Sequence, residues 1–251
     1  MKKPQGKLYL IPTTLGDIAP LEVLPISIKR AVEDIDHYIV ENEKSARRFI
    51  KKMSPRKSQS GLQIQVLNKY TEPQEIPNFL LPCLEGIPVG ILSEAGCPGV
   101  ADPGAEVVRL AHQKKIKVIP LVGPSSIILA LMGSGLNGQN FAFNGYLPIE
   151  RVERKRELKR LEKLSKEKDQ AQIFIETPYR NDKLLADMQQ ALSESTHLCI
   201  ASDITLPTED IFTKSIAEWK KHALDLHRRP TIFIFQAESG FGAINEKRRK
   251  K

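Results

Sequence analysis

Gly90–Gly104, which reads GILSEAGCPGVADPG, is the stretch around which the rest of the chain is organised. The apolar run Val89–Leu92 predicts a buried strand, and a helical pattern begins only at Ala105. Glycines in the intervening loop let the backbone approach a ligand closely, prolines fix its path, and free N–H groups can meet polar atoms. The stretch therefore indicates either a ligand-binding edge at the carboxyl end of a strand or a simple turn between a strand and a helix.

The spacing of these glycines argues against two common nucleotide sites. The loop does not follow the pattern Gly-x-Gly-x-x-Gly with a helix directly after it, and it does not end in Gly-Lys-Ser or Gly-Lys-Thr. Ordinary dinucleotide and nucleoside triphosphate sites are therefore poorly supported.

Composition favours a soluble globular protein with a polyanionic partner. The chain has 251 residues, 41% of them hydrophobic, which suffices for one large domain or two small ones. Its 38 lysines and arginines exceed its 30 aspartates and glutamates by eight, giving a formal charge of +8. Part of this excess lies in a predicted basic tail over residues 241–251.

The cysteines and the apolar segments bear on compartment. Cys83, Cys97 and Cys199 form an odd, scattered set, which predicts free thiols, a reducing compartment and no metal site. The apolar run after the basic start meets Pro12 too early for a signal sequence. The longest apolar region, residues 119–136, is interrupted by glycines, a proline and serines and predicts no membrane span. We expect a cytoplasmic protein.

Alternating strand and helix patterns predict an α/β fold in two halves. We place the domains at residues 1–122 and 123–240. Two further loops follow predicted strands, Pro12–Asp17 and Gly123–Ser126, and the second opens a helix with two hydroxyls suited to a carboxylate or a sugar hydroxyl. Late strands over 211–216 and 231–235 are expected to pair antiparallel, and Asn181 is expected to cap a helix.

A long charged helix is predicted over residues 150–168. Val152, Leu158, Leu161 and Leu164 form a narrow apolar stripe, while arginines and lysines crowd the remaining surface. The helix is either a solvated surface element with compensating glutamates or a wall that contacts phosphates, and the first reading is favoured.

Taken together, these loops resemble the tetrapyrrole methylase superfamily of S-adenosylmethionine methyltransferases. Within it, the chain is most similar to the branch that methylates a ribose 2'-hydroxyl of small-subunit (16S) ribosomal RNA. The resemblance runs in order through six blocks, Leu8–Gly16, Leu92–Gly104, Gly123–Ser126, Ser134–Pro148, Ile173–Arg180 and Ala201–Glu209.

This resemblance implies two α/β domains with S-adenosylmethionine in the cleft between them, commonly a homodimer, and ribosomal RNA or the small ribosomal subunit as partner, with no membrane. The cofactor contacts that it implies are Leu10, Pro12, Ser93, Glu94, Ala95, Gly96, Cys97, Val100, Ser125, Ser126, Glu176, Ala201 and Thr231.

The chain departs from the branch mainly on the acceptor side. The branch reads Glu-Asp-Thr-Arg where this chain has Glu41-Asn42-Glu43-Lys44, so its arginine is lost unless Arg47 or Arg48 replaces it. A Glu-Ser-Pro-His-Arg pattern appears as Glu176-Thr177-Pro178-Tyr179-Arg180. We expect a retained cofactor pocket and an altered acceptor site.

Three carboxylates are candidates for a base that activates a weakly nucleophilic ribose hydroxyl. Asp17, Glu41 and Glu176 each lie at a predicted strand end, although each could equally cap a helix or orient a loop. Arg47, Arg48 and Arg180 are candidates for contacts with RNA phosphates, or are ordinary surface arginines.

Three functions remain open at this stage. The first is methylation of an RNA ribose, the second is methylation of a porphyrinoid or a protein residue, and the third is ligand binding without turnover.

Overall fold

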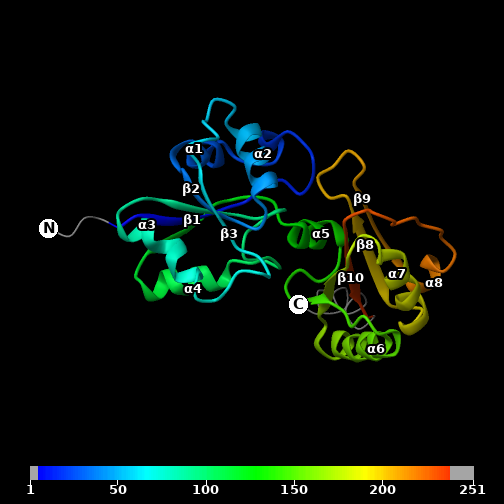
Figure 1. The fold of residues 1–251 in the computed structure, drawn as a ribbon. Coiled ribbons are helices and arrows are strands. Elements are labelled where there is room, and N and C mark those ends of the chain that lie inside the picture. Colours follow the sequence, from blue (N-terminus) through cyan, green and yellow to red (C-terminus); the bar gives the residue numbers. More distant parts are fainter. Residues whose placement is uncertain (1–4, 238–251) are drawn as a thin grey trace, which may run out of the picture. The chain divides into compact units, whose positions relative to one another are not determined.

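The computed structural model describes residues 5–237, so the predicted basic tail lies outside the described residues. The chain divides between Ser125 and Ser126 into two compact units, each built around one five-stranded sheet (Figure 1). This division lies three residues beyond the boundary expected from the sequence.

Unit 1 alternates short strands and helices. Its elements are β1 (Lys7–Ile11), η1 (Pro20–Glu22), α1 (Ile26–Asp34), β2 (His37–Val40), α2 (Glu43–Met53), β3 (Gln63–Val66), η2 (Ile76–Leu80), α3 (Leu81–Leu84), β4 (Val89–Leu92), α4 (Ala105–Gln113) and β5 (Lys117–Pro120).

The unit 1 sheet has the order β3-β2-β4-β1-β5, and each of its pairings is parallel. All four residues of β4 are buried, which explains why their sequence is a continuous apolar run rather than an alternating one. Helices α1 and α2 cover one face and α3 and α4 the other (Figure 1), and each face has its own apolar core. The loops after β1, β2 and β4 therefore leave from one edge of the sheet.

Unit 2 has a mixed sheet with helices α6 and α7 packed against it. Its elements are α5 (Ser126–Ser134), β6 (Phe141–Tyr146), α6 (Arg151–Lys168), β7 (Ala171–Ile175), α7 (Asn181–Ala191), β8 (His197–Ser202), β9 (Asp210–Ser215), α8 (Ile216–Trp219) and β10 (Thr231–Gln236).

The strand order in unit 2 is β6-β7-β10-β8-β9. The expected pairing of the two late strands with each other is wrong, because β8 lies between β9 and β10 and pairs antiparallel with both. The expected cap is also wrong. Asn181 is the first residue of α7, and its side-chain nitrogen donates to the Arg229 carbonyl at 2.7 Å instead of capping the helix.

Helix α6 is anchored by a buried ion pair that the sequence pattern does not reveal. Arg154, expected on the charged surface, is 4% exposed, and its Nη2 lies 2.5 Å from Asp187 Oδ2 on α7. Val152, expected in the apolar stripe, is 74% exposed, whereas Leu158 and Leu161 are buried. The helix is thus a surface element held by a short apolar stripe and one arginine.

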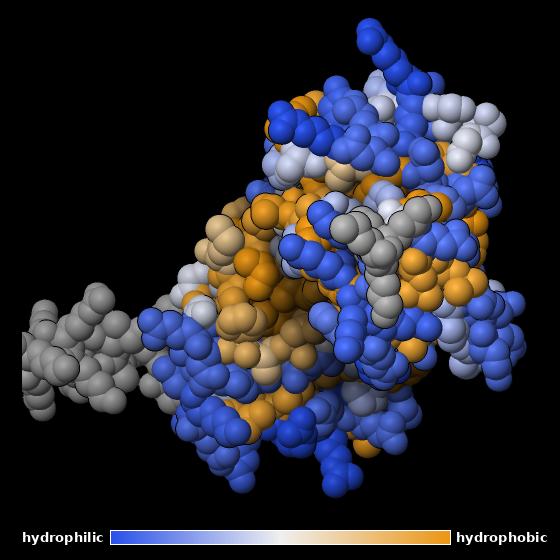
Figure 2. Space-filling model, turned by 90° about the vertical axis from the view of Figure 1, so that its left-hand side faces the viewer, coloured by the Kyte–Doolittle hydropathy of each residue, from blue (hydrophilic) through white to orange (hydrophobic). Residues whose placement is uncertain are grey.

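Hydrophilic side chains cover much of the face drawn in Figure 2, with apolar surface exposed between them. Such a mixture is ordinary for a globular surface. No helix among residues 5–237 is both long and apolar enough to cross a membrane.

Candidate functional site

The loops that follow β1 and β4 are bonded to each other at the carboxyl edge of the unit 1 sheet. The Thr13 backbone N–H donates to the Gly96 carbonyl at 3.0 Å, and the Thr13 hydroxyl lies 3.3 Å from both the Ser93 carbonyl and the Ser93 hydroxyl. Ser93 Oγ in turn donates to the Gly96 carbonyl at 2.5 Å. Both hydroxyl side chains are buried, so the two loops form one preorganised unit.

The loop that follows β5 joins the same group. The Cys97 thiol lies 3.3 Å from the Pro124 carbonyl, and burial raises the pKa of this thiol. Gly96 has a φ of +77°, and a Cβ at this position would approach the Pro124 carbonyl oxygen to 3.0 Å. A side chain here would push the loops apart, which explains the glycine.

Most of the expected cofactor residues in the first half of the chain lie on three converging loops. The exceptions are Leu10, which lies on β1, and Ser126, which is the first residue of α5 in unit 2. The others lie in the loops after β1, β4 and β5, namely Pro12, Ser93, Glu94, Ala95, Gly96, Cys97, Val100 and Ser125.

An apolar pocket of about 240 Å³ adjoins the organising loop on the α4 side of the sheet. Residues of β1, β4, the loop and α4 line it, namely Leu10, Ile91, Pro98, Gly99, Gly104, Ala105 and Val108. An apolar lining of this kind suits a flat heterocycle.

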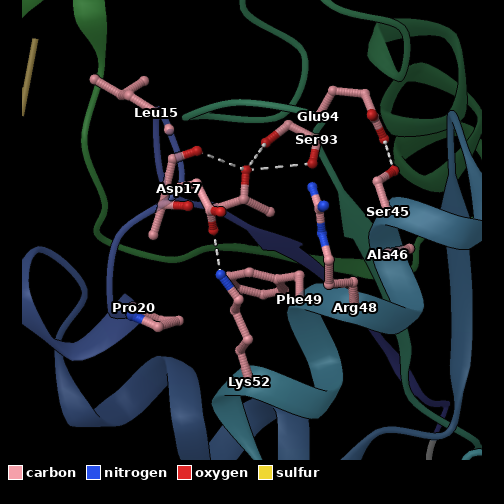
Figure 3. Close-up of a pocket in the computed structure, with 13 residues that line it drawn as sticks. Leu15, Asp17, Pro20, Ser45, Ala46, Arg48, Phe49, Lys52, Ser93 and Glu94 are labelled. Carbon is pink, nitrogen blue, oxygen red and sulfur yellow. Dashed lines mark hydrogen bonds and ion pairs between the residues drawn. The ribbon is translucent and has the colours of Figure 1, made fainter. Parts of the chain in front are cut away.

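A second pocket, of about 180 Å³, is polar and lies on the α2 side (Figure 3). The loop after β1, helix α2 and the start of the organising loop line it. In this pocket Asp17 forms an ion pair with Lys52, and Ser45 Oγ donates to Glu94 Oε1 at 2.6 Å. The hydrogen bond from Lys52 lowers the pKa of Asp17. Asp17 is therefore held as a carboxylate.

Arg48 and Arg47, the two candidates to replace the missing arginine, differ in position and in bonding. Arg48 lines the polar pocket and has neither a hydrogen bond nor an ion pair with a described residue, and Figure 3 shows its guanidinium extending toward Ser93. Arg47 instead bonds to Glu43 on its own helix and donates to the Gln59 carbonyl at 2.5 Å. Of these two arginines, Arg48 lines the pocket and Arg47 does not.

Acidic residues meet near the ends of β2 and β4. Burial and the nearby Glu41 and Glu94 raise the pKa of Asp102 to about 6, and one of its carboxylate oxygens is buried with no hydrogen-bond partner. Burial, with a contribution from Glu94, also raises the pKa of Glu41. Asp102 was missed at the level of sequence because its closeness to Glu41 depends on β2 and β4 being neighbours, which strand patterns alone do not reveal.

In unit 2, three expected residues meet at one end of the sheet. Thr231 pairs with Ser202, and Ile232 pairs with both Ala201 and Ile175, the residue before Glu176. The Thr231 hydroxyl lies 3.0 Å from the Ser202 hydroxyl. Ala201 is fully buried within β8, where it pairs with Ile232 of β10 and Ile211 of β9.

Glu176 and Arg180, assigned separate roles from the sequence, are bonded to each other. Arg180 Nη2 and Nε lie 2.5 and 3.0 Å from Glu176 Oε1, and the Thr177 N–H donates to the same oxygen at 2.6 Å. Glu176 is 7% exposed. Its carboxylate is thus occupied in fixing the turn after β7.

No group of three or more potential ligands among residues 5–237 could hold a metal ion. The three cysteines are free thiols.

The chain is similar in sequence to curated proteins named ribosomal RNA small subunit methyltransferase I. Identity is 28% over 211 residues with the Vibrio cholerae protein, covering 84% of this chain and 69% of that one. It is also 28% over 237 residues with the Escherichia coli O157:H7 protein, covering 93% and 78%. No family model matches the sequence.

Solved structures identify the fold. The methyltransferase CobJ superposes with a TM-score of 0.61 at 14% identity, covering 93% of this chain and 95% of that one. The cobalt precorrin-4 methyltransferase CbiF gives 0.59 at 15%, covering 92% and 94%. The chain has the tetrapyrrole methylase fold. The resemblance inferred from the sequence blocks is therefore confirmed at the level of the fold, and the converging loops of unit 1 lie in a tetrapyrrole methylase fold.

Proposed function

We propose that this tetrapyrrole methylase is an S-adenosylmethionine-dependent methyltransferase that acts on a ribose 2'-hydroxyl of small-subunit ribosomal RNA. The observation that carries the proposal is sequence similarity over 93% of the chain to a protein named for methylation of that RNA. The likeness to CobJ and CbiF, at 14% and 15% identity, supports the fold and carries no argument for a porphyrinoid acceptor.

The residues of unit 1 fit the proposed cofactor. The apolar pocket beside the organising loop suits the adenine ring, and the loop backbone at Ser93–Cys97 offers N–H and carbonyl groups to the polar part. Because Thr13, Ser93 and Gly96 already bond to one another, little of the loop has to be ordered when a ligand binds. The contribution of Glu176, Ala201 and Thr231 stays a prediction.

S-adenosylmethionine, when bound, supplies an electrophilic methyl group, so the protein has to align the acceptor, exclude water and accept one proton. Of the three candidate bases, Asp17 is paired with Lys52 and Glu176 with Arg180. Glu41 has neither a hydrogen bond nor an ion pair with a described residue, and its raised pKa strengthens it as a base. We therefore assign proton acceptance to Glu41 and phosphate binding to Arg48.

The partner and compartment follow from the substrate. A ribosomal RNA substrate implies that the protein works in the cytoplasm. The formal charge of +8 favours binding to a polyanion. A homodimer is part of the proposal, and sedimentation of the full chain tests it.

Two measurements test the proposed function. Calorimetry with adenosylhomocysteine should show binding, and the absence of both heat and a thermal shift would contradict the methyltransferase assignment. The protein is then incubated with methyl-labelled S-adenosylmethionine and either small ribosomal subunits or uroporphyrinogen. Label should enter the subunits, and label in the porphyrinoid alone would overturn the RNA assignment.

A further inference from the structure

Tyr179 is an exposed aromatic ring in the turn after β7, and Arg228 and His227 both contact it. The ring is 69% exposed. The guanidinium carbon of Arg228 lies 5.7 Å from the ring centroid, and the His227 ring meets it edge-on at 5.9 Å between centroids. An aromatic ring with an adjacent guanidinium is the combination with which proteins stack unpaired bases and hold the neighbouring phosphate.

The segment that carries Arg228 is fixed against the turn that carries Tyr179. The Arg228 N–H donates to the Pro178 carbonyl at 3.1 Å, Asn181 Nδ2 donates to the Arg229 carbonyl at 2.7 Å, and the Leu226 N–H donates to Asp182 Oδ1 at 2.9 Å. These three hydrogen bonds join residues 226–229 to residues 178–182.

The far side of the same segment is anchored as well. Arg229 donates to Asp203 Oδ2 at 2.7 Å and to Asp210 Oδ2 at 3.0 Å. The Arg229 guanidinium is thus bonded to two aspartates, whereas Arg228 and His227 are exposed to solvent. Arg229 thus holds the segment in place, while Arg228 lies beside the exposed Tyr179 ring.

The Tyr179 ring lies at the sheet end that also holds Glu176 and Thr231. Glu176 lies three residues before Tyr179 and Arg180 directly after it. The ion pair between Glu176 and Arg180 therefore joins the residues on either side of Tyr179. A stacked base at this position would therefore lie near residues that the sequence assigns to the methyl-transfer site.

We propose that Tyr179 and Arg228 form a stacking site for an unpaired base of the RNA substrate, with Tyr179 contacting the base and Arg228 the adjoining phosphate. The proposal rests on the proposed function, because it names how the same protein holds its RNA. Single-stranded RNA is recognised through splayed bases stacked on aromatic side chains, which a rigid exposed tyrosine provides at low entropic cost.

The test measures binding of the full chain to two labelled probes, a single-stranded oligocytidylate and an abasic strand of equal length. Tyr179→Ala should weaken oligocytidylate binding by about tenfold or more and leave abasic binding unchanged, because only the base stacks. Tyr179→Phe should bind like the wild type. Arg228→Gln should weaken both probes, because both carry phosphates.

The matched control is Phe212→Ala, which removes a ring that is 51% exposed on edge strand β9 and should change neither affinity. Far-UV circular dichroism and thermal melting establish that each variant is folded. Equal affinities of the wild type for the two probes, or equal weakening of both by Tyr179→Ala, would overturn the stacking site.

The outcome is separable from that of the proposed function. Methyl transfer to ribosomal subunits is measured on the wild type alone. A stacking effect without transfer would leave the stacking site standing and remove the methylation assignment, whereas transfer without a stacking effect would do the reverse.

Discussion

Thr13 and Ser93 place their hydroxyl oxygens 3.3 Å apart across the ends of two neighbouring parallel strands. Each residue belongs to a different loop of the proposed cofactor site, so this contact couples the shapes of the two loops. The contact is internal to the protein, which means that the loops are aligned before a ligand arrives.

Thr13→Val should loosen this coupling while keeping the size of the side chain. We expect a loss of about 1 kcal/mol in the free energy of unfolding, as is typical for one hydrogen bond. The affinity of the Thr13→Val variant for adenosylhomocysteine, measured by calorimetry, should also fall. Thr14→Val is the control, because the Thr14 side chain takes no part in the hydrogen bonds among Thr13, Ser93 and Gly96 and lines the polar pocket instead. Equal losses in both variants would contradict the special role of Thr13.

Arg48→Ala and Arg47→Ala should affect different properties. Arg48 lines the polar pocket without a hydrogen bond or an ion pair to a described residue, so its removal should lower methyl transfer to small ribosomal subunits and leave the melting temperature nearly unchanged. Arg47 is bonded to Glu43 and Gln59, so its removal should lower the melting temperature slightly and spare transfer. Transfer rates and melting curves of the two variants decide the assignment, and the reverse pattern would move the substrate contact to Arg47.

Arg154→Ala should be the most destabilising of the arginine substitutions. The side chains of Arg154 and Asp187 are 5% and 3% exposed, so the variant leaves a carboxylate buried beside α6 with only Arg151 as a partner. We expect a loss of about 3 kcal/mol or more in urea unfolding, as for other broken buried pairs. Arg156→Ala, on the same helix, is the control and should lose almost nothing. Similar midpoints for the two variants would show that α6 is not anchored by this pair.

Asp102→Asn should stabilise the protein at neutral pH. The pKa of Asp102 in the folded chain is about 6, above its ordinary value of 3.8, so the ionised carboxylate opposes folding when the pH is above 6. The opposition is relieved as the pH falls through 6 toward 3.8, because the folded state then binds the proton more tightly than the unfolded state. Melting temperatures should therefore favour the variant at neutral pH and converge with the wild type in acid. A difference that stays constant with pH would contradict this account.

Strand-end chemistry was the part of the site that the sequence predicted well. The glycines and prolines after Ile11, Leu92 and Leu121 marked all three loops that the structure brings together, because a loop built for close approach needs these residue types. The α/β fold followed from the alternation of strand and helix patterns.

Contacts between residues far apart in the chain could not be predicted from the sequence. The Asp17–Lys52 and Glu176–Arg180 pairs, which argue against two of the three proposed bases, depend on side-chain geometry. The burial of Arg154 is invisible to helical periodicity, since an arginine reads as a surface residue until its partner on α7 is known. The order of β8, β9 and β10 likewise depends on long-range pairing that local patterns do not encode.

The most direct test of the central claim is the position of the transferred methyl group. Small ribosomal subunits are labelled by the full chain with S-adenosylmethionine, their RNA is digested to nucleosides, and the labelled nucleoside is identified by mass spectrometry. We expect a single class of 2'-O-methylated nucleoside, whose yield falls in Arg48→Ala and is unchanged in Arg47→Ala. Label absent from every ribose, or present only on a base, would contradict it.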